Sequence, residues 1–345
     1  MRPSFHPRLI NDSFDDPGVF VPFQFENRAF LFDLGDIHAL TARDILKVTH
    51  VFVSHTHMDH FSGFDRLLRL CLGRDKQIHL YGPAGFLKNI EGKLAGYTWN
   101  LVDQYAAPFS LHAAEVCGST LLTREYRCRD SFKAAGPPVE VPFSGILLAE
   151  PALTVSAIVL DHRTDCLGFS LEERFHVNII KEALSQMGLS VGPWIRDFKQ
   201  ALFCGADPSS EFIVSVGSGE KEKRRFQLGE LSKRITRITP GQKIVYLTDM
   251  AGSTANLEKA VPFAMNADQL FVEAAFLEAD RQIANEKRHL TARDAGRIAA
   301  LAGTKQYALF HYSPRYTDRA HEIEQEAAEA FHTRYLSLFG LLADS

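Results

Sequence analysis

The sequence predicts an α/β fold whose buried strands end at one polar site. Strand-like apolar runs alternate with helical segments along the chain. Four of these runs end in residue types that bind metals: His55, His162, Asp249 and His311. The stretch 54–63, which follows the first of these runs, contains three histidines and one aspartate within six positions. Ligand-type residues at several strand ends indicate a site where those ends meet.

Composition limits the class of protein. The 345 residues are 46% hydrophobic and 23% charged, which is typical of a globular chain, and the net charge of −4 does not indicate a nucleic-acid binder. The five cysteines are scattered and form no Cys-x-x-Cys motif, which favours a reducing compartment. No apolar run has the length of a signal peptide or a membrane span. We therefore expect a cytoplasmic protein that does not associate with membranes.

The first elements lead to the His/Asp-rich stretch. Residues 17–33 predict a hairpin that turns at 26–27, and Asp33 at its end either orients a ligating histidine or only forms a turn. A short helix is expected to begin at 41–44. The run 48–53 predicts the buried strand that precedes the His/Asp-rich stretch.

The stretch 54–63 predicts a metal site. His55 and His57 lie two positions apart, so alternation along a strand points them to the same side, and we expect Asp59 to continue that alternation while His60 points elsewhere. The pattern can serve two adjacent ions, with His55 and His57 binding one and Asp59 and His60 the other. Imidazole ligands suit zinc, and the carboxylates admit manganese or iron.

The middle of the chain adds a second histidine at a strand end. We expect helices at 64–72 and 86–94, a strand at 77–81, and irregular strands to about 150. The run 153–162 predicts a strand that ends in His162, and 166–172 predicts its partner. A lone histidine at this position is either structural or a ligand, and its strand-end position favours a ligand.

Residues 172–243 look like an embellishment of the core. We expect a helix over 172–187 that 188–193 interrupts. A basic segment follows, which is either the charged surface of a hairpin or a contact for a phosphate backbone. Its basic residues are Lys221, Lys223, Arg224, Arg225, Lys233, Arg234, Arg237 and Lys243, opposed by Glu220, Glu222 and Glu230.

The last third supplies three more candidate site residues. The strand 243–249 ends in Asp249, which either bridges two metals or caps a turn. The next strand ends in Glu273. His289 precedes a helix over 292–302, where the partial positive charge of a helix N-terminus suits a phosphate. The strand 305–311 ends in His311, and a helix to about 331 follows.

The motif His-x-His-x-Asp-His at 55–60 resembles the signature of the metallo-β-lactamase fold. The resemblance implies a four-layer αβ/βα sandwich, with metals at the edge between two sheets. Within that superfamily the chain is similar to ribonuclease Z, the endonuclease that removes the 3′ trailer from precursor tRNA. The similar blocks are 273–276, 289–295 and 309–316, and Gly192-Pro193 resembles the region where that family inserts an arm that grips tRNA.

The resemblance to ribonuclease Z implies roles for individual residues. Its ligands would be His55, His57, His162 and Asp249 for one metal ion, and Asp59, His60, Asp249 and His311 for the other. Asp59 would also act as base towards the attacking water, and His289, oriented by Glu273, would donate the proton to the leaving oxygen. Arg224, Arg225 and Arg315 are the expected substrate-binding residues. We expect one domain over 1–345 with an inserted segment at about 172–243, two divalent metal ions, and a homodimer.

Three functions are compatible with this pattern. The first is a dinuclear, metal-dependent phosphodiesterase that acts on RNA such as precursor tRNA. The second is a hydrolase of the same fold that acts on a small molecule, for example a cyclic nucleotide or other small phosphodiester, an ester, a lactone or a thioester. The third is a non-catalytic RNA-binding relative. A complete ligand set favours an enzyme, and the absence of a flavin-binding module from the sequence argues against a redox diiron role.

Overall fold

The computed structural model describes residues 4–24, 26–216 and 222–343. The chain forms two compact units. The larger takes in Phe5–Leu147, Val155–Ser170 and Lys243–Ser345, and the smaller takes in Met1–Ser4, Leu148–Thr154 and Leu171–Gln242. The boundary between the units falls within β9 (Ile146–Ala149), β10 (Leu153–Asp161) and β11 (Asp165–Glu173). Whether 172–243 is an insertion in a single domain stays a prediction.

The first sheet of the larger unit has its eight strands in sequence order. The predicted hairpin forms, since Val19 pairs antiparallel with Phe32. Neighbouring strands from β3 to β6 are parallel, and β7 and β8 continue antiparallel. The strands are β1 (Arg8–Leu9), β2 (Val19–Pro22), β3 (Ala29–Phe32), β4 (Val48–Phe52), β5 (Lys76–Gly82), β6 (Phe109–Cys117), β7 (Thr120–Arg127) and β8 (Val139–Pro142).

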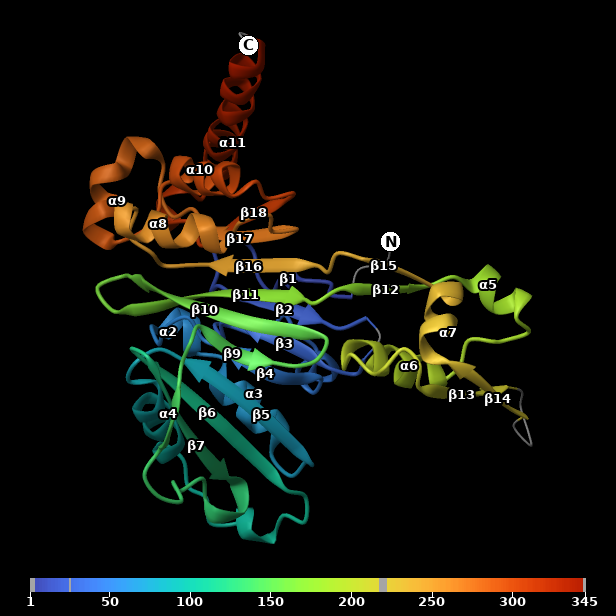
Figure 1. Cartoon of the computed structure of the whole chain (residues 1–345). Helices are drawn as coiled ribbons and strands as arrows, with labels where there is room; N and C mark the ends of the chain where they lie inside the picture. Colours follow the sequence, from blue (N-terminus) through green and yellow to red (C-terminus); the bar gives the residue numbers. More distant parts are fainter. Residues whose placement is uncertain (1–3, 25, 217–221, 344–345) are drawn as a thin grey trace. The chain divides into compact units, whose positions relative to one another are not determined.

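Helices cover one face of this sheet (Figure 1). Alternate side chains such as Leu31, Val51 and Leu80 form a core with Phe64 and Phe86 from the helices. The helices and turns that follow these strands are α1 (Ala42–Ile45), α2 (Met58–Phe61), α3 (Phe64–Cys71), α4 (Phe86–Ala95) and the 3₁₀ turns η1 (Val102–Gln104) and η2 (Cys128–Asp130). The predicted start of α1 is confirmed, because the Thr41 side chain accepts a hydrogen bond from the Asp44 N–H.

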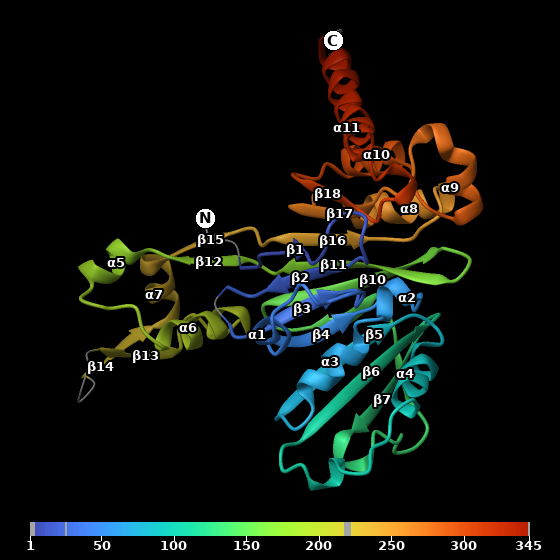
Figure 2. The same cartoon turned by 180° about the vertical axis from the view of Figure 1, so that it is seen from behind.

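The second sheet has the strand order β18-β17-β16-β11-β10-β9. Its strands β16 (Lys243–Leu247), β17 (Gln269–Glu273) and β18 (Tyr307–Phe310) are parallel and bury Val245, Leu270 and Val272 against helices. Figure 2 shows the same elements from behind. The helices are α8 (Thr254–Phe263), α9 (Arg281–Lys287), α10 (Ala292–Ala302) and α11 (Ala320–Ala343), with the turns η3 (Glu278–Asp280) and η4 (Pro314–Tyr316). The last helix thus extends past the expected end near 331.

Aromatic side chains join the inner faces of the two sheets. Phe32 stacks on Phe169 and on Tyr246, with ring centroids 5.7 and 5.9 Å apart, and Tyr246 stacks on Phe310 at 5.2 Å. All four rings are buried. Helices therefore cover the outer faces of two sheets that pack against each other, and the predicted four-layer αβ/βα sandwich is confirmed. No helix among the described residues has the length and apolar character needed to cross a membrane.

The smaller unit contains one correction to the sequence analysis. Residues 172–180 are not helical, because β11 continues to Glu173 and β12 (His176–Ile179) pairs antiparallel with β15 (Thr236–Thr239). Val177, which is buried, faces Ile238 across this pair, and such branched side chains fit a strand better than a helix. The helix begins only at α5 (Lys181–Gln186), and the later elements are α6 (Trp194–Phe203), β13 (Glu211–Val216), β14 (Glu222–Gln227) and α7 (Leu228–Ile235).

Part of the predicted basic segment forms a hairpin. Strands β13 and β14 pair antiparallel, with Ile213 opposite Arg225 and Val214 opposite Arg224. The guanidinium of Arg225 lies 3.3 Å from the Glu211 carboxylate. Of the residues named in the sequence analysis, Glu220 and Lys221 lie outside the described residues.

A close backbone contact fixes the turn after α2. The Gly63 N–H donates to the Leu34 carbonyl at 2.9 Å, and the Leu34 N–H donates to the His60 carbonyl at 2.9 Å. A Cβ at position 63 would lie 2.2 Å from the Gly35 carbonyl oxygen. Only glycine fits there unless the backbone moves.

We predict that Gly63→Ala lowers the free energy of unfolding by about 1–3 kcal/mol, because the added methyl group overpacks a backbone contact. Urea denaturation would measure the loss. Gly92→Ala is the matched control, since a Cβ at this helical position meets nothing within 4 Å and should stabilise by up to about 1 kcal/mol. Equal stabilities of Gly63→Ala and wild type would contradict the packing assigned to this turn.

Candidate metal centre

The His/Asp-rich stretch lies directly after β4 and does not continue as a strand. His57 precedes the single helical turn α2, and the His60 N–H donates to the His57 carbonyl at 3.1 Å. The expectation that Asp59 continues strand alternation is therefore wrong, because residues 58–61 curl into a helical turn. That turn places Asp59 and His60, which are adjacent in sequence, in one ligand group together with His311.

The structure brings all seven sequence-predicted metal ligands together in the larger unit. The ligand atoms of His55, His57, His162 and Asp249 lie within 4.8 Å of one another. Those of Asp59, His60 and His311 form a second such group. These residues follow β4, β10, β16 and β18, so the strand ends do converge as the sequence analysis expected.

Asp249 faces both groups with different oxygens. Its Oδ2 lies 3.6 Å from His55 Nε2 and 3.4 Å from His162 Nε2. Its Oδ1 lies 3.4 Å from His60 Nε2 and 3.2 Å from His311 Nδ1. The carboxylate is buried and directs one oxygen to each group. This is the arrangement of a bridging ligand rather than of a helix cap, and the N-cap of α8 is instead Ser253.

The arrangement of the donor atoms suits metal coordination better than hydrogen bonding between the side chains. The buried nitrogens His55 Nε2, His60 Nε2 and His311 Nδ1 have no hydrogen-bond partner, and a buried polar atom left in this state is costly. Two ligands of one tetrahedral zinc ion, each about 2.0–2.2 Å from the metal, lie about 3.4 Å apart. The separations of 3.2–3.6 Å around Asp249 match that spacing.

Buried partners orient two of the imidazoles. Asp33 accepts hydrogen bonds from His60 Nδ1 at 2.7 Å and from the Tyr246 hydroxyl at 2.7 Å. It also accepts from Ser54, through the backbone N–H at 2.6 Å and Oγ at 2.8 Å. His162 Nδ1 donates to the Arg288 carbonyl at 2.9 Å. Each contact leaves Nε2 free to face Asp249, so Asp33 takes the orienting role that the sequence analysis left open.

The ligand-type residues differ in the charge they carry without a metal ion. Burial raises the pKa of the Asp59 carboxyl, but the hydrogen bond from His311 and the nearby His60 outweigh it and lower the pKa to about 2. Burial lowers the pKa of His55 to about 2, so this imidazole is neutral. Burial also opposes charge on His60, yet Asp249 and Asp33 raise its pKa to about 10. A metal ion at His60 therefore has to displace a proton.

Glu273 and His289 form a pair beside these groups. His289 Nδ1 lies 2.8 Å from Glu273 Oε2, and Glu273 Oε1 accepts the Met250 N–H at 2.7 Å. The contact of 2.8 Å is a hydrogen bond that holds a proton, unlike the longer separations around Asp249. The imidazole of His289 stands 4.9 Å from that of His162, measured between ring centroids. The pair therefore lies next to the other ligand groups, and Glu273 and His289 also form a ligand-type group with Asp249 and His311.

The predicted substrate-binding arginines are not gathered at the centre. Arg315 lies in the larger unit, 3.2 Å from Asp280 and over the ring of Phe276. Arg224 donates to the Met187 carbonyl at 3.2 Å, within the smaller unit. Arg225 also lies in the smaller unit. Tyr246 and Arg288 also contact the ligand network, and the sequence analysis did not predict either contact. Arg288 acts through its backbone carbonyl, which leaves no sequence signal, and Tyr246 resembles any buried strand residue.

Comparison with known proteins places this site in context. No protein-family model matches the chain. A ribonuclease Z from Deinococcus radiodurans is 30% identical over 295 residues, which cover 85% of this chain and 84% of that protein. A ribonuclease Z from Rippkaea orientalis is 27% identical over 298 residues, covering 83% and 77%.

Solved structures share the fold at lower identity. The metallo-β-lactamase fold protein YhfI from Bacillus subtilis superposes with a TM-score of 0.52 and 15% identity over 94% of each chain. The short form of human tRNase Z superposes with a TM-score of 0.50 and 18% identity, covering 91% of this chain and 93% of that one.

Proposed function

The chain belongs to the ribonuclease Z family, and we propose that its RNA phosphodiesterase activity removes the 3′ trailer of precursor tRNA. The observation that carries this proposal is the position of the Asp249 carboxylate. One of its oxygens faces one pair of imidazoles and the other oxygen faces a second pair, and each pair has a further carboxylate or histidine beside it. A site of this kind serves the hydrolysis of a phosphodiester, where attacking and leaving oxygens both carry charge.

Two divalent metal ions would be held by seven side chains. We assign His55, His57, His162 and Asp249 to one ion, and Asp59, His60, Asp249 and His311 to the other. When bound, the ions would lower the pKa of a water molecule and stabilise the charge on the phosphate oxygens. The abundance of imidazole favours zinc, and manganese and iron are the alternatives.

Asp59 is the proposed base towards the attacking water. Its Oδ2 lies 3.2 Å from His311 Nε2 and 3.6 Å from His60 Nε2, while its side chain is 43% exposed. The other carboxylates of the network, Asp33, Asp249 and Glu273, are buried. Asp59 therefore combines an ionised carboxylate with access for water, which a base at this site needs.

His289 is the proposed proton donor to the leaving oxygen. Burial lowers its pKa, but the Glu273 carboxylate outweighs burial, and the net pKa is raised above its ordinary value. This shift favours the imidazolium form, and Glu273 holds the ring through Nδ1 so that Nε2 stays available to the substrate. His289 also lies two residues before the N-cap of α10, where positive partial charge favours an approaching phosphate.

Further parts of the proposal concern the wider substrate and the assembly. We assign phosphate contacts to Arg315 of the larger unit and to Arg224 and Arg225 on the hairpin of the smaller unit. Cytoplasmic location and a homodimer remain proposals that rest on composition and on family resemblance.

The direct test is cleavage of a precursor tRNA with a 3′ trailer by protein loaded with zinc or manganese. We expect a cut at the base of the acceptor stem, reduced at least about 10²-fold in Asp59→Ala because the base is lost. Mapping the ends of the products measures both. Asp318→Ala, at an exposed aspartate that belongs to none of the ligand groups, should match wild type. Hydrolysis of a chromogenic phosphodiester without any RNA cleavage would favour the small-molecule alternative.

The role of His289 predicts a shift in the pH profile. Loss of the carboxylate in Glu273→Gln removes the interaction that raises the pKa of His289, so the acid loses its proton at lower pH. The alkaline limb of kcat against pH should therefore move to lower pH, and His289→Ala should lower kcat by about 10²–10⁴-fold. An unchanged alkaline limb in a folded, metal-loaded Glu273→Gln protein would contradict the role of His289 as proton donor.

A further inference from the structure

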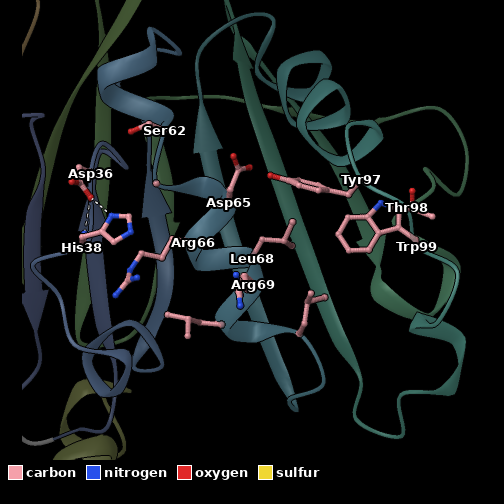
Figure 3. Close-up of a pocket in the computed structure, with 13 residues that line it drawn as sticks. Asp36, His38, Ser62, Asp65, Arg66, Leu68, Arg69, Tyr97, Thr98 and Trp99 are labelled. Carbon is pink, nitrogen blue, oxygen red and sulfur yellow. Dashed lines mark hydrogen bonds and ion pairs between the residues drawn. The ribbon is translucent and has the colours of Figure 1, made fainter.

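A groove on the larger unit begins where the metal-binding turn ends. It has a volume of about 980 Å³ and runs along α3 (Figure 3). Asp36 and His38 stand on one side, Arg66 and Arg69 project from α3, and Tyr97 and Trp99 form the other side, and we call this the α3 groove. Its volume is at the upper end of the range for ligand sites.

The wall of the α3 groove is tied to the metal centre through one loop. Ser62 and Gly63 line the groove and lie two and three positions after His60 in the chain. The loop residue Leu34 accepts the Gly63 N–H and donates to the His60 carbonyl. A ligand strand in the groove would therefore lie close along the chain to the residues proposed to bind metal.

Two acidic side chains and two arginines line the α3 groove, and the acidic side chains are engaged by other partners. Asp36 accepts two hydrogen bonds from His38, through its N–H at 2.7 Å and its Nδ1 at 2.5 Å. Asp65 pairs with the Lys93 ammonium at 3.0 Å. Arg66 and Arg69 have no ion pair or hydrogen bond among the described residues, and Arg66 Nε is buried without a partner. Two arginines left in this state offer sites for anionic oxygens.

Two aromatic side chains form one side of the α3 groove, and contacts hold Trp99 in place. Trp99 Nε1 donates to the Leu94 carbonyl at 2.8 Å, and its ring packs edge-on against Phe132 with centroids 4.8 Å apart. Tyr97 stands 5.7 Å from Trp99 at an interplanar angle of 67°, and 45% of its surface is exposed. A fixed aromatic wall opposite arginines is typical of sites that stack unpaired bases and hold the phosphates between them.

We propose that the α3 groove binds the unpaired nucleotides of the 3′ trailer, with Arg66 and Arg69 on phosphates and Tyr97 stacking a base. This inference rests on the proposed function, since it assigns a site to the single-stranded part of that substrate. The acceptor stem is a duplex, whose stacked bases cannot reach an aromatic side chain. The trailer is unpaired, so its bases can reach an aromatic side chain and stack on it.

The test compares precursor tRNAs that carry a one-nucleotide trailer or a long unpaired trailer. Wild type should cleave the RNA with the long trailer at the higher kcat/KM. In Tyr97→Ala and in the double variant Arg66→Ala/Arg69→Ala, the ratio of kcat/KM for the long trailer to that for the short trailer should fall about tenfold. The double variant should also lower the slope of log affinity against log salt for the long trailer by about 1.4, at about 0.7 per phosphate contact. Arg297→Ala, an exposed arginine on α10, is the matched control and should keep both.

Three results would count against the groove or the function, and they are distinguishable. RNA cleavage with the wild-type trailer preference and salt slope in the folded double variant would overturn the groove alone. A dimer that sedimentation detects in wild type and not in the double variant, with trailer preference intact, would assign the groove to a second copy of the chain. No cleavage of either RNA by metal-loaded wild type would contradict the proposed function itself.

Discussion

The candidate site depends on where the Asp249 carboxylate is held. Four imidazoles face its two oxygens at 3.2–3.6 Å, and these imidazoles come from three other segments of the chain. Asp33, Asp249 and His311 all adopt positive φ angles, of 58, 41 and 62°. Each such non-glycine residue costs about 1–3 kcal/mol, a strain that packed surroundings sustain at functional sites. The sandwich of two sheets thus supplies the rigidity that keeps an anionic bridge buried among nitrogen donors.

The site contains two kinds of carboxylate–histidine contact. Around Asp249 the separations are 3.2–3.6 Å, and three of the facing nitrogens, His55 Nε2, His60 Nε2 and His311 Nδ1, lack hydrogen-bond partners, so they suit a cation. Between Glu273 and His289 the distance of 2.8 Å holds a proton instead. Under the proposed function, the two chemistries of phosphodiester hydrolysis, activation of water and protonation of the leaving group, fall to separate and neighbouring residues.

Much of this site could be predicted because strand ends leave a local signal. An apolar run followed by a ligand-type residue is visible at His55, His162, Asp249 and His311 without knowledge of the fold. Geometry within turns was less visible, since alternation failed at Asp59, where α2 curls. The expected helix over 172–180 failed because strand pairing with residues 236–239, distant in sequence, outweighs local helical propensity. Contacts through a backbone carbonyl, such as that of Arg288, have no sequence pattern at all.

The most direct test of this account is a count of bound metal by elemental analysis after saturation with zinc and removal of free ions. We expect two ions for each wild-type chain. In Asp249→Asn one of the bridging oxygens becomes an amide nitrogen, which cannot serve as an anionic ligand, and at most one ion should remain in a protein whose circular dichroism is unchanged. A single ion in wild type, or two equally retained ions in Asp249→Asn, would contradict a centre built on a shared carboxylate.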